Sequence, residues 1–464
     1  MEALLTLTIG LPLAIVLGLA LPMLLWLAYS RITVGLVIVL ATFFMEVVYI
    51  EYPGFWVGMY IYPTDLVFAF LALAALSRLF IAGDFPGRSL PWLLFGAVVV
   101  VSFALGLAQF GKAAGTDFRN YFYVWICALY FMSFPVDPAR TQAIVRVWLV
   151  FAGLLLGLAC FRWVAEFSGM PIAATWRDGS KAEEFRVLPS GAALYLVNTL
   201  LILAYAIAAR VAKRWVWVAV PVLLVAILVL QHRSVWIAAA AGIAAMYVVF
   251  PGQIRLKLAR PIVAAVAVVV VVSGTLTAYG RLDTLMYKVG ESAATATDLA
   301  GGTSGGRLYG WHQLLLQLEP VEYAIGKPFG SGYERYEFPN VRWKATYDPH
   351  NFYLQTLLRS GAIGLALLLM TYVVTFRRLL RHRDEPGRLA LPPRLVVVML
   401  VTQMAYILTY RMPYEQVVWL GLAVGIAASL RRPSATGGAS LLGTAEMKPD
   451  PLEYAGGLGN LVRR

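Results

Sequence analysis

The chain has 464 residues, of which 60% are hydrophobic and 14% are charged, and it carries a formal net charge of +13. Soluble proteins average about 25% charged residues, so this composition excludes an ordinary soluble enzyme and indicates a polytopic membrane protein. The two cysteines, Cys127 and Cys160, lie within apolar runs, which argues against a disulfide framework or a cysteine metal cluster.

Apolar windows of about 17–25 residues, long enough to cross about 30 Å of hydrocarbon, follow one another along the chain. No basic stretch with a cleavage site precedes the first window, so we expect a retained span rather than a signal peptide. Pro12 and Pro22 in that window favour a kink or a re-entrant turn, which reduces the expected count of spans from thirteen to twelve. The expected fold is an all-α polytopic membrane protein with about 12–13 transmembrane helices. The thirteen windows are residues 4–29, 32–50, 64–82, 91–110, 120–135, 144–165, 188–209, 214–231, 233–250, 261–279, 351–376, 391–411 and 413–430.

Lysine and arginine collect in alternate connections between these windows, and short cytoplasmic loops carry such an excess. We therefore assign residues 51–65, 166–186 and 280–350 to the outer side. Most of the positive charge is then cytoplasmic, so the basic character of the chain requires no nucleic-acid partner. The basic, cytoplasmic connections hold Arg78 and Arg88; Arg140 and Arg146; Arg210, Lys213 and Arg214; Arg255, Lys257 and Arg260; and residues 377–388.

This topology divides the chain into a transmembrane domain at residues 1–430 and a cytoplasmic tail at residues 431–464. The tail is rich in Gly, Ala, Ser and Pro, a composition that predicts disorder. A large outer loop at residues 280–350 interrupts the transmembrane domain, and we expect short helices within it.

Several arginines lie on the outer side, where the charge rule does not require them. Arg233 follows His232 in "LVLQHRSVWIAAAAG", a hairpin of a few residues between two apolar windows, and a charge at that depth indicates a functional site. The alternative is an interfacial arginine that reaches lipid phosphate. Arg186 in "EEFRVLPSG" is a second candidate, although Glu183 and Glu184 are able to pair with it. The outer arginines are Arg119, Arg162, Arg177, Arg186, Arg233, Arg307, Arg335, Arg342 and Arg411.

A cluster of outward arginines suits an anionic ligand. Guanidinium groups bind phosphate oxygens in a planar, bidentate geometry that lysine does not offer. We therefore expect a phosphate or diphosphate at the outer face, with Arg307, Arg342 and Arg411 among its contacts.

The large outer loop contains two further patterns. "GGTSGGRLYGWHQLLLQLEP" predicts an amphipathic helix that lies on the membrane surface or caps a cavity. We expect Leu308, Trp311, Leu315 and Leu318 to form its apolar face. "IGKPFGSGYERYEF" is a glycine-rich and aromatic loop without a nucleotide fingerprint. Tyr333 in this loop suits sugar binding, and interface anchoring is the alternative.

His350 lies in "DPHNFYLQTLLRSGAIG", where Pro349 ends the loop and Asn351 opens the next apolar window. A neutral imidazole here is able to accept a proton from a hydroxyl group or to hold it by a hydrogen bond, with Asp348 orienting the ring. A helix-capping role is the alternative. No metal-ligand spacing occurs, so we expect neither a metal nor another cofactor.

These residues resemble the O-antigen ligase and O-antigen polymerase superfamily. His350 and Asn351, nine intervening residues, and then Gly361 and Gly364 are similar to its His-Asn and Gly-x-x-Gly signature. The resemblance covers roughly residues 186–376. It includes "QHRSVWIAAAAG", "GRLYGW" and "GKPFGSGYERY".

The resemblance implies a metal-independent, inverting membrane glycosyltransferase of GT-C-like fold in the bacterial inner membrane, with its active site facing the periplasm. The implied donor is a glycan on undecaprenyl diphosphate. The implied acceptor is lipid A-core in a ligase or another lipid-linked glycan in a polymerase. Arg186 and Arg233 match the arginines that hold the diphosphate, and His350 matches the residue that activates or orients the acceptor hydroxyl. Arg307 and Asn351 are further substrate contacts by the same comparison.

Two other classes of function fit the same residues. A transporter of a lipid-linked sugar would use the arginines as a substrate path, but the sequence has no inverted repeat and no acidic residue in mid-span for ion coupling. A non-catalytic scaffold would use His350 only as a helix cap. Glycan transfer by the purified protein separates the enzyme from both.

Overall fold

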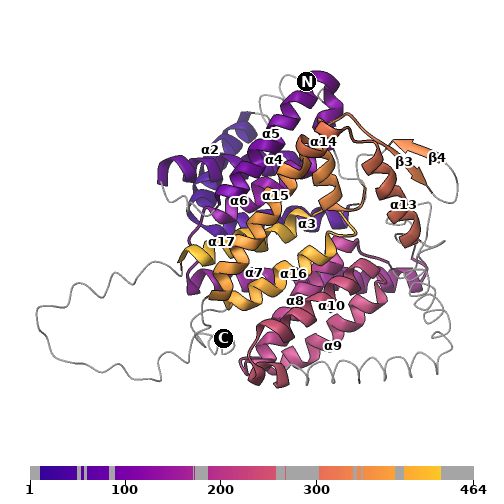
Figure 1. Ribbon diagram of the computed structural model, residues 1–464. Coiled ribbons are helices and arrows are strands. Elements are labelled where there is room, and N and C mark those ends of the chain that lie inside the picture. Colours follow the sequence, from indigo (N-terminus) through magenta and orange to yellow (C-terminus); the bar gives the residue numbers. More distant parts are fainter. Residues whose placement is uncertain are drawn as a thin grey trace, which may run out of the picture.

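The computed structural model describes residues 11–49, 54–56, 60–82, 89–170, 172, 186–257, 267, 303–337, 342–345, 349–381 and 391–429. Helices dominate this part of the chain (Figure 1). They are α2 (Leu11–Ser30), α3 (Ile32–Val48), α4 (Pro63–Ser77), η2 (Arg78–Ala82), α5 (Leu90–Phe110), α6 (Lys112–Met132), α7 (Pro138–Phe167), α8 (Ser190–Ala208), α9 (Arg214–Val229), α10 (Arg233–Val249), α13 (Thr303–Leu316), α14 (Pro320–Ile325), α15 (Phe352–Arg381), α16 (Pro393–Tyr406) and α17 (Tyr414–Ser429).

The expected all-α polytopic membrane fold is confirmed. Within the described residues, five helices are long and apolar enough to cross a membrane, and α9, α10, α16 and α17 are shorter apolar helices. Large apolar side chains on their outward faces stay exposed, for example Val101, Val150 and Val218, as hydrocarbon solvent allows. The count of 12–13 spans stays a prediction, because the window at 261–279, apart from residue 267, lies outside the described residues, as does the tail at 431–464. The five long spans are Pro63–Ile81, Leu90–Phe110, Ala139–Phe167, Ser190–Ala208 and Phe352–Arg381.

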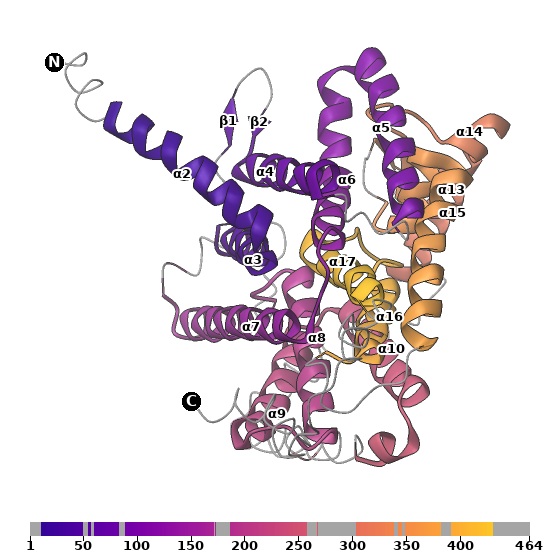
Figure 2. The same ribbon diagram turned by 90° about the vertical axis from the view of Figure 1, so that its left-hand side faces the viewer.

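The first two apolar windows form a bent pair. Residues Leu21–Ser30 and Ile32–Val48 meet at an angle of 116°, as a broken span or a re-entrant loop would. Pro22 lies inside α2, and the break falls instead at Arg31, whose extended backbone interrupts the helical hydrogen bonds. Figure 2 shows α2 projecting obliquely away from the other helices.

Helix α6 begins at Lys112, well before the predicted window at 120–135. Its first turns contain Asp117 and Arg119, which lowered the apparent hydropathy of this stretch. Both charges have partners: Asp117 pairs with Arg359, and Arg119 pairs with Asp65. Because these charges are compensated, they are tolerated within the helix. The helix therefore begins earlier than the hydropathy window indicates.

The described connections also contain two short antiparallel hairpins that the sequence pattern did not indicate. β1 (Phe55–Trp56) pairs with β2 (Tyr60–Ile61), and β3 (Glu334–Glu337) pairs with β4 (Arg342–Ala345). Each is a local pairing of two strands beside the helices, so neither forms a sheet that organises the fold.

Polar contacts define two opposite ends of the α4, α6 and α17 group. At one end, Glu46 in α3 accepts hydrogen bonds from Thr64 at the start of α4 (2.6 Å) and from Tyr414 at the start of α17 (2.8 Å). At the other end, Arg78 donates to the carbonyl oxygens of Tyr29 and Ser133. The side chain of Ser429, at the end of α17, accepts from the Val136 amide there. The three helices therefore run parallel between these ends.

A buried ion pair, the Asp117–Arg359 clamp, ties α6 to α15. The Arg359 Nε and Asp117 Oδ2 atoms are 2.7 Å apart, and both side chains are almost fully buried. The clamp also holds the glycine-rich loop after α14, because Asp117 Oδ2 accepts from the Gly330 amide and Arg359 donates to the Ser331 hydroxyl (2.7 Å). Residues of the large outer loop are thus fixed to the helical core.

Gly361 explains part of the glycine signature. Its φ of +62° interrupts α15, a backbone conformation that favours glycine. A Cβ atom at this position would lie 2.0 Å from the Ala324 carbonyl oxygen. The glycine therefore permits α14 to cross α15 at close range. At Gly364 the nearest obstacle is the Ser360 side chain instead.

The end of helix α13 contributes to a small apolar cluster with α15. Leu314 and Leu318 are buried in a small cluster with Leu354 and Leu358 of α15. Leu308, predicted to share the apolar face, is 50% exposed and lies outside this cluster. The face is rotated toward Trp311, Leu314 and Leu318 because the partner is a single helix rather than a flat membrane surface.

Candidate active site

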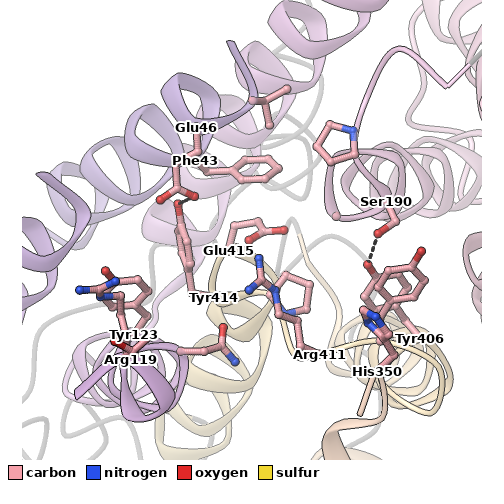
Figure 3. Close-up of a pocket in the computed structure, with 17 residues that line it drawn as sticks. Phe43, Glu46, Arg119, Tyr123, Ser190, His350, Tyr406, Arg411, Tyr414 and Glu415 are labelled. Carbon is pink, nitrogen blue, oxygen red and sulfur yellow. Dashed lines mark hydrogen bonds between the residues drawn. The ribbon is translucent and has the colours of Figure 1, made fainter. Parts of the chain in front are cut away.

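A cavity of about 740 Å³ opens at the Glu46 end of the helix group (Figure 3). Its walls come from α3, α6, the start of α8, the turn before α15, the end of α16, the start of α17 and the connection between these last two helices. Such a volume accommodates a small-molecule moiety. The lining residues are Phe43, Glu46, Val47, Thr116, Arg119, Asn120, Tyr123, Pro189, Ser190, Gly191, His350, Tyr406, Tyr410, Arg411, Pro413, Tyr414 and Glu415.

His350 lines this cavity in a backbone conformation that is unusual for a residue other than glycine. Its φ is +52°. The surroundings fix this turn: the Trp311 indole donates to the Pro349 carbonyl (2.9 Å), and the Phe352 amide donates to the Ile407 carbonyl (3.0 Å). Strain maintained by neighbouring contacts is typical of functional positions.

Asn351 is the capping residue of α15. Its side-chain oxygen accepts a hydrogen bond from the Leu354 amide (3.0 Å), and the residue is buried. The capping role considered for His350 is thus filled by its neighbour. The imidazole of His350 instead lies against the Tyr410 ring, with centroids 5.9 Å apart.

Tyr410 connects His350 to two other side chains. The Tyr406 ring stacks on it at 5.3 Å, and Tyr406 in turn shares a 2.7 Å hydrogen bond with the Ser190 hydroxyl. The guanidinium group of Arg307 also lies over Tyr410, 5.7 Å from the ring centre. It donates a hydrogen bond to the Thr409 carbonyl oxygen. The structure therefore brings two sequence-predicted residues, His350 and Arg307, to one aromatic column.

Arg186 and Arg233 meet at a different place, the hairpin between α9 and α10. Arg186 donates to the Gln231 carbonyl (3.2 Å), and Arg233 begins α10 two residues later. His232 between them contacts the Leu188 carbonyl through Nε2 (2.8 Å). Neither arginine lines the cavity, although the segment from Arg186 runs directly into the cavity residues Pro189 to Gly191.

The His232 ring is neutral at ordinary pH. Removal from solvent lowers its pKa to about 4, and the positive charge of Arg186 acts in the same direction. A neutral ring that contacts a carbonyl oxygen donates its Nε2 hydrogen. His232 therefore holds the hairpin between α9 and α10, called here the arginine hairpin (residues 230–233), against the segment that begins α8.

Three other predicted site residues occupy distinct positions. Arg411 lines the cavity directly. Tyr333 is buried, and its ring lies 4.9 Å from the guanidinium carbon of Arg359, so it packs against the Asp117–Arg359 clamp. Arg342 belongs to β4, opposite Glu337. The side chains of Arg335 and Arg342, like residues 173–185, lie outside what the structure describes.

Two other outer arginines have structural roles. Arg162 is buried and donates to the carbonyl oxygens of Val187 (2.7 Å) and Val47 (2.6 Å). Arg119 lines the cavity but is engaged with Asp65 at 3.0 Å and with the Tyr60 carbonyl. By contrast, no hydrogen bond or ion pair connects Arg411 to any residue in the described part of the chain.

Sequence reasoning missed the carboxyl and amide groups of the cavity: Glu46, Glu415 and Asn120. Glu46 and Glu415 stand at span ends, and the stretch "RMPYE" at 411–415 carries a charge at each end of a very short connection. The rule that singled out arginines at span ends applies equally to acids there. It would have identified Glu415.

The comparisons with known proteins give one family. Residues 218–369 match the family model described as O-antigen ligase. The matched segment contains the arginine hairpin at Arg233, the loop residue Arg307 and the signature from His350 to Gly364. No curated protein matches the chain.

Proposed function

We propose that this chain, whose residues 218–369 match the family model described as O-antigen ligase, is a glycosyltransferase that uses a polyprenyl-linked donor. In this proposal it moves a glycan from undecaprenyl diphosphate to a hydroxyl group of lipid A-core. The reaction takes place at the periplasmic face of the bacterial inner membrane.

The observation that carries the proposal is the placement of His350. The histidine of the signature lines a cavity at one end of the helices, in a strained turn held by Trp311. This position supports the proposal, because a cavity beside the histidine leaves room for a substrate, whereas a capping residue would need no cavity.

The distribution of basic residues supports the periplasmic orientation. Arg78 and Arg140, both assigned to the cytoplasmic side, contact the carbonyl groups of Ser133 and Pro135 at the end opposite the cavity. With that end in the cytoplasm, the cavity opens toward the periplasm.

The proposed mechanism assigns separate roles to the two groups of residues. His350 accepts the proton of the acceptor hydroxyl, whose oxygen bonds to the anomeric carbon as the bond from that carbon to the phosphate oxygen breaks, with inversion. Arg186 and Arg233 compensate the negative charge that develops on the departing diphosphate. This division needs no metal ion for charge compensation.

The test is an incubation of the purified protein with an undecaprenyl diphosphate-linked oligosaccharide, with and without lipid A-core. Product that forms only with lipid A-core supports the ligase. A ladder of longer lipid-linked glycans in its absence identifies a polymerase instead. Absence of product in both reactions contradicts the proposal and favours a transporter.

A further inference from the structure

Three polar groups in the cavity have the geometry of a ligand site. Glu415 is 2% exposed, and its Oε1 atom has no hydrogen-bond partner among the described residues. Asn120, on the facing helix α6, likewise has an Nδ2 atom without a described partner. Native proteins rarely leave such buried groups unpaired unless water, an ion or a ligand satisfies them.

Arg411 contributes an opposite charge to the same space. It is close enough to influence Glu46 and Glu415 electrostatically, yet it forms an ion pair with neither. Figure 3 shows Arg411 and Glu415 directed into the cavity from the connection before α17 and from its first turn. The cavity thus presents a hydrogen-bond acceptor, a guanidinium donor and an amide donor at separate points.

The local backbone preserves the position of the Glu415 carboxyl. Gly191, at the start of α8, faces it so closely that a Cβ atom would lie 2.9 Å from Oε1. Glu415 also lies in the first turn of α17. The N-termini of two helices, α8 and α17, therefore lie at this carboxyl group.

The remaining wall is largely aromatic. Phe43, Tyr123 and Tyr414 pack edge to face on one side, and the stacked Tyr406 and Tyr410 lie on the other. Flat apolar faces with a few convergent polar groups match the two sides of a sugar ring, which has C–H surfaces and equatorial hydroxyls.

Diphosphate fits this cavity less well than sugar does. Glu46 and Glu415 both line it, and carboxyl groups repel phosphate oxygens when ionised. The arginines assigned to the diphosphate, Arg186 and Arg233, lie outside the lining. Arg411, also predicted to contact phosphate, does line the cavity, so only the pair assigned to the diphosphate by the resemblance lies apart from it.

We propose that the cavity is a glycan-binding subsite, in which Glu415, Arg411 and Asn120 hydrogen-bond to hydroxyl groups of one sugar ring beside His350. This inference rests on the proposed function, because it takes the substrate to be a glycan. The sugar belongs either to the acceptor or to the donor, and the two sources share this chemistry.

The test measures binding of three probes to the full-length protein in lipid nanodiscs. The probes are core oligosaccharide freed from lipid A, an O-antigen repeat oligosaccharide freed from its lipid, and undecaprenyl diphosphate alone. We expect Glu415→Gln to weaken binding of one sugar probe by about 10-fold or more, with undecaprenyl diphosphate unaffected. The sugar that is affected identifies the source.

Two further variants keep this test independent of folding. Glu415→Gln should unfold at an equal or higher temperature than the wild type, because it removes a buried carboxyl group that forms no ion pair with a described residue. Gly191→Ala leaves every charge in place but displaces the carboxyl, so it should weaken the same sugar probe. Asp137→Asn, at the opposite end of the helices, is the isosteric control and should bind like the wild type.

The inference and the proposed function fail in different ways. Unchanged sugar binding by Glu415→Gln, weakened undecaprenyl diphosphate binding, or no sugar binding by the wild type overturns the subsite. If sugar binding depends on Glu415 but the wild type transfers no glycan, the proposed glycosyltransferase function is contradicted and the glycan-binding subsite is supported.

Discussion

Asp117 and Glu415 are both buried carboxyl groups, 4% and 2% exposed, but their surroundings differ. Asp117 accepts from the Gly330 amide and lies 2.7 Å from Arg359. Glu415 has no ion-pair partner among the described residues, and the nearby Arg411 is not bonded to it. A paired buried charge holds segments together, whereas an unpaired one lowers stability unless something binds it.

The same contrast separates two regions of the molecule. The Asp117–Arg359 clamp attaches the glycine-rich loop to the core, whereas the cavity combines the left-handed backbone of His350 with polar groups that face open space. Substitutions at the clamp should therefore mainly lower stability. Substitutions at the cavity or the arginine hairpin should mainly lower activity.

The largest expected effect is on transfer by His350→Ala and Arg233→Ala. Loss of a positioned proton acceptor reduces rates by about 100- to 10,000-fold, and loss of charge compensation reduces them comparably. Initial transfer rates should fall below detection while expression stays intact. His312→Ala on the exposed side of α13 and Arg377→Ala at the end of α15 are the matched controls. Near-normal transfer by either site variant would remove that residue from the site.

Arg359→Met tests the other side of the comparison. It leaves Asp117 buried without its ion-pair partner, which costs about 3–5 kcal/mol. The midpoint of thermal unfolding should drop strongly. The double variant Asp117→Asn with Arg359→Met should recover part of the loss, since the asparagine oxygen still accepts from Gly330 and no charge remains. If the double variant is less stable than Arg359→Met alone, the clamp is not the source of the effect.

Gly361→Ala should lower stability by more than about 1 kcal/mol, because the backbone has a positive φ and the Ala324 carbonyl oxygen blocks a Cβ atom. Gly153→Ala in α7 is the matched control. Nothing lies within 4 Å of its Cβ position, so alanine there should be neutral or stabilising. Equal unfolding midpoints for the two variants would show that the interruption of α15 does not depend on glycine.

The sequence was sufficient for the membrane fold and for several residues of the site. Apolar length predicts most spans, and Asn351 does stand at the start of α15, where it accepts a hydrogen bond from the Leu354 amide. Its predicted contact with substrate stays a prediction. The roles of His350, Arg233 and Arg186 in transfer stay predictions. The start of α6 was missed because its charges find partners far along the chain, in Arg359 and Asp65.

Long-range pairing also explains why the carboxyl groups of the cavity were missed. Glu46 and Tyr414 are separated by 368 positions and meet only in the folded chain. A hydropathy pattern reports where a segment lies relative to the membrane, but not which span ends meet.

The smallest expected effect concerns pH and the arginine hairpin. His232 has a pKa of about 4 in the folded protein, below the ordinary value of 6.5, so the unfolded chain binds a proton first as pH falls. The stability that depends on the neutral ring is complete above about pH 6.5, declines from there to about pH 4, and then levels off. The unfolding midpoint of the wild type should fall across this window by a few degrees more than that of His232→Gln, which has no titrating group at this position. Parallel pH profiles for the two proteins would mean that the ring is solvated, and that the hairpin carrying Arg233 is held to α8 by other contacts.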